Sequence, residues 1–451
     1  MALEDALAGW LVKQRWFAGK GRELRDLAIV ADTQIVGGDP ELRHLIVVVS
    51  YGATVDYYQV LAGLRQELPD ELQHAHIGPS GDGRQVYDAL HDADLTRPLL
   101  AGMAAEQSIG SLHMRKMPGA SFQTGLDSLV LSAEQSNTSL VYGEESILKV
   151  FRRLSPGPNP DLEVTSALAR LGSSHVAEPF GWIETRLDGV STSLAILSRY
   201  LRLASDGWSL AATSVRDLYA MDDATGDAVR AAEAGGDFAG EAHRLGIATA
   251  QVHADLAIAF GTDELGPDAV RELTEQMYRK LDLAVDAVPE LGRYSEMIGD
   301  AYSSMAKLKG PFPVQRVHGD YHLGQVLRTT GSGWVVLDFE GEPATSLAQR
   351  RARSSPLRDV AGMLRSFDYA ARHQLIGHPD QGTLNTVASD WVRRNASAFC
   401  AGYAEAGGPD PDENDVLLRA LQLDKAVYEV LYEAGHRPSW LQIPLDSLAE
   451  F

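Results

Sequence analysis

Two polar stretches decide the fold of this chain: Val317-His-Gly-Asp-Tyr-His-Leu-Gly-Gln-Val326 and, starting twelve residues after Gln325, Leu337-Asp-Phe-Glu-Gly-Glu-Pro343. The apolar residues beside them predict two neighbouring strands that each end in a polar loop. Asp320 precedes Gln325 by five residues, and Asp338 follows on the second strand. This order matches the catalytic loop and the metal loop of kinases.

These residue types suit phosphoryl transfer to a hydroxyl group. Such a transfer needs a carboxylate within hydrogen-bond reach of the attacking oxygen, and oxygen ligands that hold Mg²⁺ on the β- and γ-phosphates of ATP. We therefore expect Asp320 to be the catalytic base, and Gln325 and Asp338 to bind the metal.

Two other interpretations of the same residues stay open. His-Gly-Asp is also typical of a turn in which Asp320 caps backbone amides, and Asp338 is then an ordinary carboxylate at a strand end. Alternatively, His318, Asp320 and His322 together resemble a zinc-ligand cluster of a hydrolase. No further histidine cluster in the sequence supports the zinc site.

A lysine-bearing strand is predicted upstream. The stretch Gln135-Ser-Asn-Thr-Ser-Leu-Val-Tyr-Gly143 is followed by Ile147-Leu-Lys-Val-Phe151, and a predicted helix at 160–171 carries Glu163. A lysine in an apolar strand is often just an edge residue. Here the order of loop, lysine strand and acidic helix suits an ammonium group on the α- and β-phosphates, held by a carboxylate. We expect Lys149 and Glu163 to fill these roles.

The loop before the lysine strand lacks the usual phosphate-binding glycines. Neither Gly-x-Gly-x-x-Gly nor Gly-x4-Gly-Lys-Ser/Thr occurs there. The hydroxyl and backbone N–H groups of Ser136, Asn137, Thr138 and Ser139 are expected to replace them.

The composition excludes several classes of function. The chain has 40 Lys+Arg and 62 Asp+Glu, a net charge of −22, which repels nucleic acid and anionic lipid. The single cysteine, Cys400, allows no internal disulfide and no cysteine-based zinc cage. The first residues carry acids early, and no apolar run is long enough to span a membrane. We expect a cytoplasmic protein, a monomer or weak homo-oligomer, with a small-molecule partner, no nucleic acid and no membrane.

The element pattern predicts an α+β fold in three parts. Residues 1–90 form a small strand-rich unit, residues 91–200 add strands with one inserted helix, and residues 201–451 are mostly helical. The expected elements are a helix at 3–15, strands at 44–50, 56–61, 129–131, 139–142, 146–151 and 193–197, and helical stretches near 237–260, 268–286, 387–406 and 413–435.

A family resemblance rests on seven stretches across nearly the whole chain. They are Gln14-Arg-Trp-Phe-Ala-Gly19, Ala133-Glu-Gln-Ser-Asn-Thr-Ser139, Ile147-Leu-Lys-Val-Phe-Arg-Arg153, Val317–Arg328, Asp338-Phe-Glu-Gly-Glu-Pro343, Leu357-Arg-Asp-Val-Ala-Gly362 and Asp424-Lys-Ala-Val-Tyr-Glu429. The chain resembles the actinobacterial maltokinases and their relatives among the aminoglycoside-phosphotransferase-like kinases. The resemblance implies a bilobal, protein-kinase-like fold with an N-terminal cap domain, and ATP held between the lobes. Ser198 and Tyr200 then lie in the hinge near the adenine.

The resemblance also implies a sugar acceptor. Maltokinases phosphorylate maltose at its anomeric hydroxyl, and related members are similar to glucosamine kinases, which phosphorylate O6. The acceptor is expected against Asp320 and His322, the loop that carries Glu340, and a C-terminal helix. That helix presents Asp424, Tyr428, Tyr432 and Glu433.

Two departures from the maltokinase pattern favour an amino sugar. Tyr321 replaces the usual leucine of His-Gly-Asp-Leu-His, and Gly435 replaces an arginine. Losing an arginine beside an acidic surface removes a like charge for an ammonium substrate. Glucosamine is thus the expected acceptor and maltose the alternative.

Two other activities fit the sequence less well than sugar phosphorylation. A pseudokinase would lack a base, a metal ligand or the lysine, whereas Lys149, Asp320, Gln325 and Asp338 are all present. A protein kinase would carry an Ala-Pro-Glu segment after Asp338, and none occurs.

Overall fold

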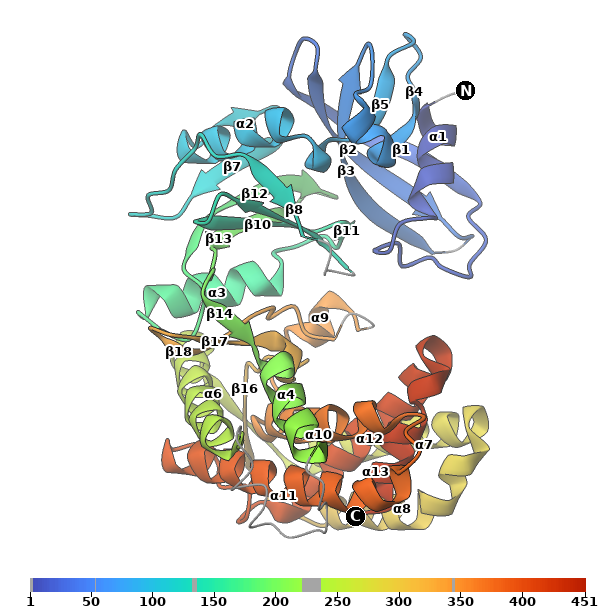
Figure 1. Cartoon of the computed structure of the whole chain (residues 1–451), viewed down its shortest axis with the longest axis vertical. Coiled ribbons are helices and arrows are strands. Elements are labelled where there is room, and N and C mark those ends of the chain that lie inside the picture. The colour runs from blue at the N-terminus through green and yellow to red at the C-terminus, as the bar shows by residue number, and fades with distance from the viewer. Residues whose placement is uncertain (1–2, 53, 132–135, 221–236, 343–344) are drawn as a thin grey trace. The chain divides into compact units, whose positions relative to one another are not determined.

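The computed structural model describes residues 3–52, 54–131, 136–220, 237–342 and 345–451 (Figure 1). The sequence stretches around Gln135 and Pro343 therefore lie partly outside the described residues. The chain divides into two compact units, Met1–Ser166 with Ala177–Arg202, and Ala167–Val176 with Leu203–Phe451. The three-part division at residues 90 and 200 stays a prediction.

The first unit begins with a six-stranded antiparallel sheet in the order β1-β2-β3-β5-β4, to which β11 adds by pairing with β3. Its strands are β1 (Asp26–Val36), β2 (Glu41–Ser50), β3 (Val55–Arg65), β4 (His76–Pro79), β5 (Gln85–Asp88) and β11 (Arg153–Leu154). Helix α1 (Leu3–Leu11) buries one face, with Leu7, Trp10 and Leu11, in a core shared with Trp16 and Tyr58. Long runs of β-branched and aromatic residues in β2 and β3 favour these strands.

A second, seven-stranded sheet of this unit has the order β6-β7-β12-β13-β10-β9-β8. Its strands are β6 (Ser108–Ile109), β7 (Leu112–Lys116), β8 (Ser128–Val130), β9 (Thr138–Tyr142), β10 (Ser146–Val150), β12 (Pro179–Leu187) and β13 (Val190–Arg199). Helix α2 (Ala93–Ala104) contacts β7, β8 and β12, and helix α3 (Pro160–Arg170) starts after β11. The sheet positions Lys149 near the end of β10, with Ser139 of β9 and Ile196 of β13 on either side.

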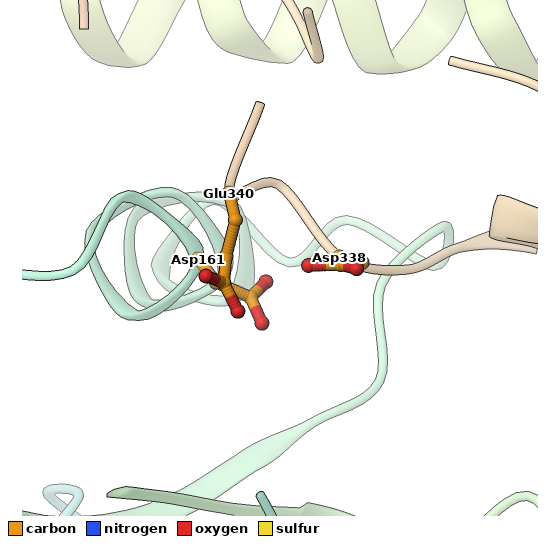
Figure 2. A group of neighbouring side chains, drawn as sticks. All are labelled: Asp161, Asp338 and Glu340. Carbon is orange, nitrogen blue, oxygen red and sulfur yellow. The ribbon is translucent and has the colours of Figure 1, made fainter. Parts of the chain in front are cut away.

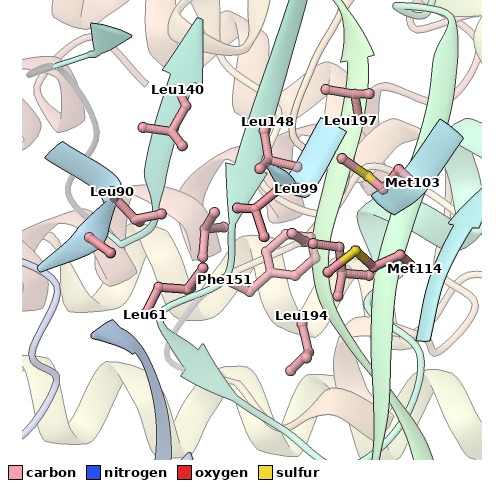
Figure 3. Close-up of a cluster of buried hydrophobic side chains, with 14 of the residues drawn as sticks. Leu61, Leu90, Leu99, Met103, Met114, Leu140, Leu148, Phe151, Leu194 and Leu197 are labelled. Carbon is pink, nitrogen blue, oxygen red and sulfur yellow. The ribbon is translucent and has the colours of Figure 1, made fainter. Parts of the chain in front are cut away.

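The two sheets share one hydrophobic core (Figure 3). Leu61 and Leu90 pack in the same cluster as Leu140, Leu148 and Leu197. Polar side chains also cross this junction, among them Gln59 of β3, whose Nε2 donates to the carbonyl oxygens of Phe151 at 2.8 Å and Leu194 at 2.6 Å. The junction therefore has both buried apolar surface and satisfied hydrogen bonds.

The second unit is mostly helical, with three short strands in one sheet and two in another. Its helices are α4 (Gly207–Tyr219), α6 (Ala239–Phe260), α7 (Pro267–Ala287), α8 (Ser295–Ala306), α9 (Leu347–Arg350), α10 (Leu357–Arg372), α11 (Gln381–Glu405), α12 (Asp415–His436) and α13 (Gln442–Leu448). Its strands are β14 (Ala204–Asp206), β15 (Thr262–Leu265), β16 (Phe312–Gln315), β17 (Val326–Thr329) and β18 (Gly333–Val336). No helix in the described part of the chain is long and apolar enough to cross a membrane.

Reciprocal glycines let α6 and α11 pack closely. A Cβ atom on Gly246 would stand 2.1 Å from the carbonyl oxygen of Phe399, and one on Gly402 would stand 2.1 Å from that of His243. Only glycine fits at such a backbone approach.

The predicted α+β class and the helical second half are confirmed. One detail is wrong, because Val317 is not in a strand. Strand β16 ends at Gln315 and pairs with β15, whereas β18 pairs with β17, so the two polar stretches do not follow neighbouring strands. After β16 the backbone N–H groups of His318 and Gly319 donate to the buried carboxylate of Asp359 and not to a neighbouring strand.

Candidate functional site: the loop after β16 and the cavity beside it

A buried carboxylate shapes the His-Gly-Asp loop. Asp359, in the first turn of α10, accepts from the backbone N of His318 at 2.7 Å and of Gly319 at 2.9 Å. The same carboxylate contacts His253 Nε2 at 3.0 Å. Burial raises the pKa of Asp359, but the hydrogen bond and charge of His253 and the loop contacts outweigh it, so the pKa is lowered. The ionised carboxylate thus fixes the backbone that presents Asp320.

Helix α10 also meets the loop through Gly362. A Cβ atom at this position would stand 2.6 Å from the carbonyl oxygen of Tyr321. The Tyr321 hydroxyl itself is held by Thr249 Oγ1 at 2.8 Å. This tyrosine, unusual for the resembled family, therefore has a satisfied polar end in the core.

We expect Gly362→Ala to lower stability by about 1–3 kcal/mol, because the new methyl group forces helix and loop apart. The displaced loop should also reduce turnover. Thermal melting and steady-state kinetics measure both. Gly435→Ala is the matched control: beyond the neighbouring residues and backbone of its own helix, no heavy atom of the described residues lies within 4 Å of the added methyl group, and a glycine within α12 should gain helix stability on this change. Equal melting temperatures of Gly362→Ala and the parent protein would contradict the expectation.

Asp320 belongs to a small charged cluster. Lys425 Nζ of α12 donates to Asp320 Oδ1 at 3.4 Å and to Glu342 Oε1 at 2.9 Å, and Arg358 reaches Glu342 Oε2 at 3.4 Å. Burial tends to raise the pKa of Asp320, but the nearby Lys425, His322 and His318 together lower it by more, so the net shift is downward. The pKa of Lys425 is raised: burial opposes the shift, but Asp320 and Glu342 outweigh it. The lowered pKa favours the ionised form of Asp320, which its predicted role as a base requires.

The structure brings Gln325 and Asp338 together. Gln325 Nε2 lies 3.4 Å from Asp338 Oδ2, and Leu337 N donates to Gln325 O at 2.8 Å. Figure 2 shows Asp338 and Glu340 on the loop that follows β18. Asp338 has a φ of 59°, a left-handed backbone conformation that is rare for a residue with a side chain. Amide and carboxylate oxygens are the donors that Mg²⁺ prefers, so this pair fits the predicted metal role.

The zinc interpretation gains no support from the histidines. His318 Nε2 bonds to the Leu337 carbonyl oxygen at 2.7 Å, and His322 Nδ1 accepts from Gly324 N at 3.1 Å, which caps a short 3₁₀ helix. Both imidazoles are thus used to shape the loop.

In the first unit, Lys149 Nζ donates to Asp161 Oδ2 at 3.1 Å. Asp161 lies in the first turn of α3, as Figure 2 shows, two residues before the predicted partner Glu163. Asp161 is itself fixed, because its backbone N donates to Asn159 Oδ1. Asp161 was not predicted from the sequence. The helix dipole stabilises a carboxylate in the first turn of a helix, so the position of Asp161 at the start of the predicted helix was a signal that could have indicated it.

The predicted phosphate loop is partly strand. Thr138 and Ser139 are buried in β9, and the Thr138 hydroxyl accepts from Arg152 Nε at 2.8 Å. Ser136 is exposed, and Asn137 Nδ2 donates to its hydroxyl. The two predicted hinge residues lie at the end of β13 and just after it, where Ser198 pairs with Ile147 and Tyr200 N donates to Glu145 O at 2.8 Å.

A cavity of about 510 Å³ opens in the second unit. Its lining includes Gly319 and Tyr321, which come directly before and after Asp320 in the sequence. It also includes Glu342 and, from α12, Asp424, Lys425 and Tyr428. The Tyr428 ring lies under Lys425 Nζ, 4.7 Å from its centroid. Asp424 Oδ2 accepts from Lys280 Nζ at 2.6 Å, whereas its Oδ1 is buried without a hydrogen-bond partner in the described part of the chain.

The other predicted acceptor residues lie differently. Glu433 is 1% exposed; it accepts from Arg437 at 2.6 Å and from the Tyr369 hydroxyl at 3.1 Å. Tyr432 stacks between Tyr428 and His436 and is partly exposed. Glu340 Oε2 lies 3.9 Å from Arg350 Nη1. Neither Tyr432, Glu433 nor Glu340 is among the residues that line the cavity.

Comparisons with known proteins identify relatives of this chain. The maltokinase N-terminal cap domain model matches residues 10–92, and the phosphotransferase enzyme family model matches residues 129–342. A glucosamine kinase of Streptacidiphilus jiangxiensis is 32% identical over 74% of this chain and 74% of its own. A glucosamine kinase of Mycolicibacterium smegmatis is 28% identical over 71% of this chain and 79% of its own.

A solved structure has the same fold over almost the whole chain. It is a glucosamine kinase in complex with glucosamine, ADP and inorganic phosphate, with a TM-score of 0.68, 25% identity, and coverage of 99% of this chain and 98% of that one. The predicted cap domain and kinase-like fold are thereby confirmed.

Proposed function

Because this chain belongs to the phosphotransferase enzyme family, we propose that it transfers the γ-phosphoryl group of ATP to a hydroxyl group of glucosamine. The maltokinase-type cap and the identity of about 30% to glucosamine kinases support this proposal. The single observation that carries the choice of acceptor is Asp424 Oδ1, a buried and unpartnered carboxylate oxygen in the cavity wall within the described part of the chain. Leaving such an atom unsatisfied costs about 1–3 kcal/mol or more, which a bound donor removes.

An ammonium group is the donor that suits this oxygen. A charge-assisted bond to Asp424 contributes about 1.5–3 kcal/mol, which is roughly a ten- to a hundredfold preference over a neutral sugar. Tyr428 offers a ring face against which the apolar face of a pyranose packs. We do not place Glu433 against the acceptor, because it is not among the residues that line the cavity and both of its oxygens accept from Arg437.

In the reaction, Asp320 accepts the proton of the attacking hydroxyl. The hydroxyl oxygen forms a bond to the γ-phosphorus as the bond from that phosphorus to the β–γ bridging oxygen breaks, and ADP leaves. Lys425 keeps Asp320 ionised and oriented, since it bonds to both Asp320 and Glu342. Lys149, paired with Asp161, offers its ammonium to the α- and β-phosphates.

The donor set of Gln325 and Asp338 suits Mg²⁺. The Gln325 amide nitrogen faces Asp338 Oδ2, so the amide oxygen is the Gln325 atom that would act as a ligand. The bound ion would neutralise negative charge on the β- and γ-phosphates.

An ATP-consumption assay with Mg²⁺ tests the proposal against glucosamine, maltose, glucose and N-acetylglucosamine. We expect glucosamine to be preferred over glucose at least tenfold in kcat/KM, and N-acetylglucosamine, which lacks the ammonium, to be poor. Preference for maltose would favour the second candidate, for which the maltokinase-type cap is the supporting observation. No turnover with any sugar would favour the pseudokinase interpretation.

A further inference from the structure

The cavity beside Asp320 has two chemically different ends. Glu342, Asp424, Lys425 and Tyr428 form the polar end. Polar residues also line the cavity from α9 to the start of α10, among them Arg353, Ser354 and Arg358. Apolar residues line the part that is formed by α7, α8, α12 and the β15–β16 hairpin. They include Val270, Leu273, Met277, Met305, Phe312 and Leu421.

The same helix faces carry both ends. On α12, Leu421 stands three and four residues before Asp424 and Lys425, so all three share one face. On α7, Leu273 and Met277 share a face with Lys280, which bonds to Asp424. Each helix therefore changes from apolar to charged along one continuous wall.

A free hexosamine matches only part of this wall. Its hydroxyl groups need hydrogen-bond partners, and side chains such as Leu273 and Met277 offer none, so placing hydroxyls there is costly. The volume of about 510 Å³ lies in the range of pockets that hold drug-sized ligands. Met277 and Met305 are flexible, adaptable side chains that suit apolar groups of varied shape.

We propose that the acceptor is an amino sugar that carries an apolar substituent, such as an alkyl or aryl glycoside, with the ammonium at the polar end and the substituent between α7 and α12. This inference rests on the proposed function, because it places the amino sugar against Asp424. A substituent on the anomeric oxygen removes that hydroxyl, so the phosphoryl group goes to another one. Asp320 takes the proton and ADP leaves, as before.

A series of glucosamine glycosides tests the inference: methyl, butyl and hexyl β-glucosaminide beside free glucosamine, in the ATP-consumption assay with Mg²⁺. We expect KM to fall with chain length, by up to about fourfold for each buried methylene. Turnover of the hexyl glycoside with a KM well below that of the methyl glycoside supports the inference, whether or not free glucosamine reacts.

The outcomes separate this inference from the proposed function. If glucosamine reacts and KM does not fall with chain length, the extended acceptor is overturned while glucosamine phosphorylation stands. If neither glucosamine nor any glucosaminide reacts, both are overturned.

Two leucines of α7 give matched variants. Leu273→Asn places an amide in the apolar wall and should reduce the ratio of methyl to hexyl KM at least tenfold. Leu283→Asn makes the same change on an exposed part of the same helix, outside the cavity lining, and should leave the ratio unchanged. Equal ratios for both variants, each with the melting temperature of a folded protein, would overturn the assignment of this wall.

Discussion

Asp320→Asn is expected to lower kcat by about 10²-fold or more while ATP binding is unchanged. The substitution keeps the size of the side chain but removes the proton acceptor, and a positioned base contributes about that factor. Asp320 is partly buried, ionised and bonded to Lys425, so the neutral amide changes the chemistry of the loop more than its shape. Steady-state kinetics with glucosamine, together with calorimetric titration of ATP, measure the two quantities separately.

Asp282→Asn is the control for the loss of one negative charge. This aspartate is exposed on α7 and does not line the cavity. Its replacement should change neither kcat nor ATP affinity. Near-normal turnover of Asp320→Asn with unchanged ATP binding would show that another group accepts the proton, and the proposed mechanism would then be wrong.

Lys425→Met is expected to reduce kcat/KM roughly ten- to a hundredfold at neutral pH and to move the acid limb of the pH profile upward. The factor corresponds to a lost charge-assisted bond of about 1.5–3 kcal/mol. Lys425 helps to keep the pKa of Asp320 below its ordinary value, so its removal raises that pKa. Activity needs the ionised carboxylate, so it is lost as pH falls through the pKa, and a higher pKa means loss at a higher pH. A pH profile of kcat/KM measures the shift.

A second variant separates the charge effect from a packing effect. In Lys425→Met with Glu342→Gln, Asp320 loses both the cation and the neighbouring carboxylate that opposes its ionisation. The acid limb should then move part of the way back toward that of the parent protein. A profile identical to that of Lys425→Met alone would contradict the electrostatic role of this cluster.

The central residues of the site could be predicted because their spacing is local. Asp320, Gln325 and Asp338 lie on two short stretches, and the structure places Gln325 and Asp338 side by side as the spacing suggested. Their catalytic and metal roles stay predictions. Helices α6, α7, α11 and α12 could be located because their apolar residues repeat with the helical period over many residues.

Contacts between distant segments could not be predicted in this way. Asp359 holds the loop from about 40 residues downstream, and a carboxylate in an amphipathic helix gives no sign of which backbone it will meet. The sequence suggested that Glu433 could bind an ammonium group, but in the structure it accepts a hydrogen bond from Arg437, one helical turn later. Val317 was predicted to lie in a strand because its apolar neighbours suit a strand. Instead, the next residue, His318, donates its backbone N–H to Asp359 and not to a neighbouring strand.

The shared core of the first unit limits how this protein can be recombined with its relatives. Gln59, on the cap side, supplies hydrogen bonds to carbonyl groups of Phe151 and Leu194, and leucines from both sheets interdigitate around them. A cap grafted from another kinase would bring a different complementary surface and would remove the Gln59 donor from the Phe151 carbonyl, whereas the Leu194 carbonyl would still accept from Phe151 N. The cap and the lysine-bearing sheet are therefore expected to diverge as a matched pair, with substitutions on one side accompanied by substitutions on the other.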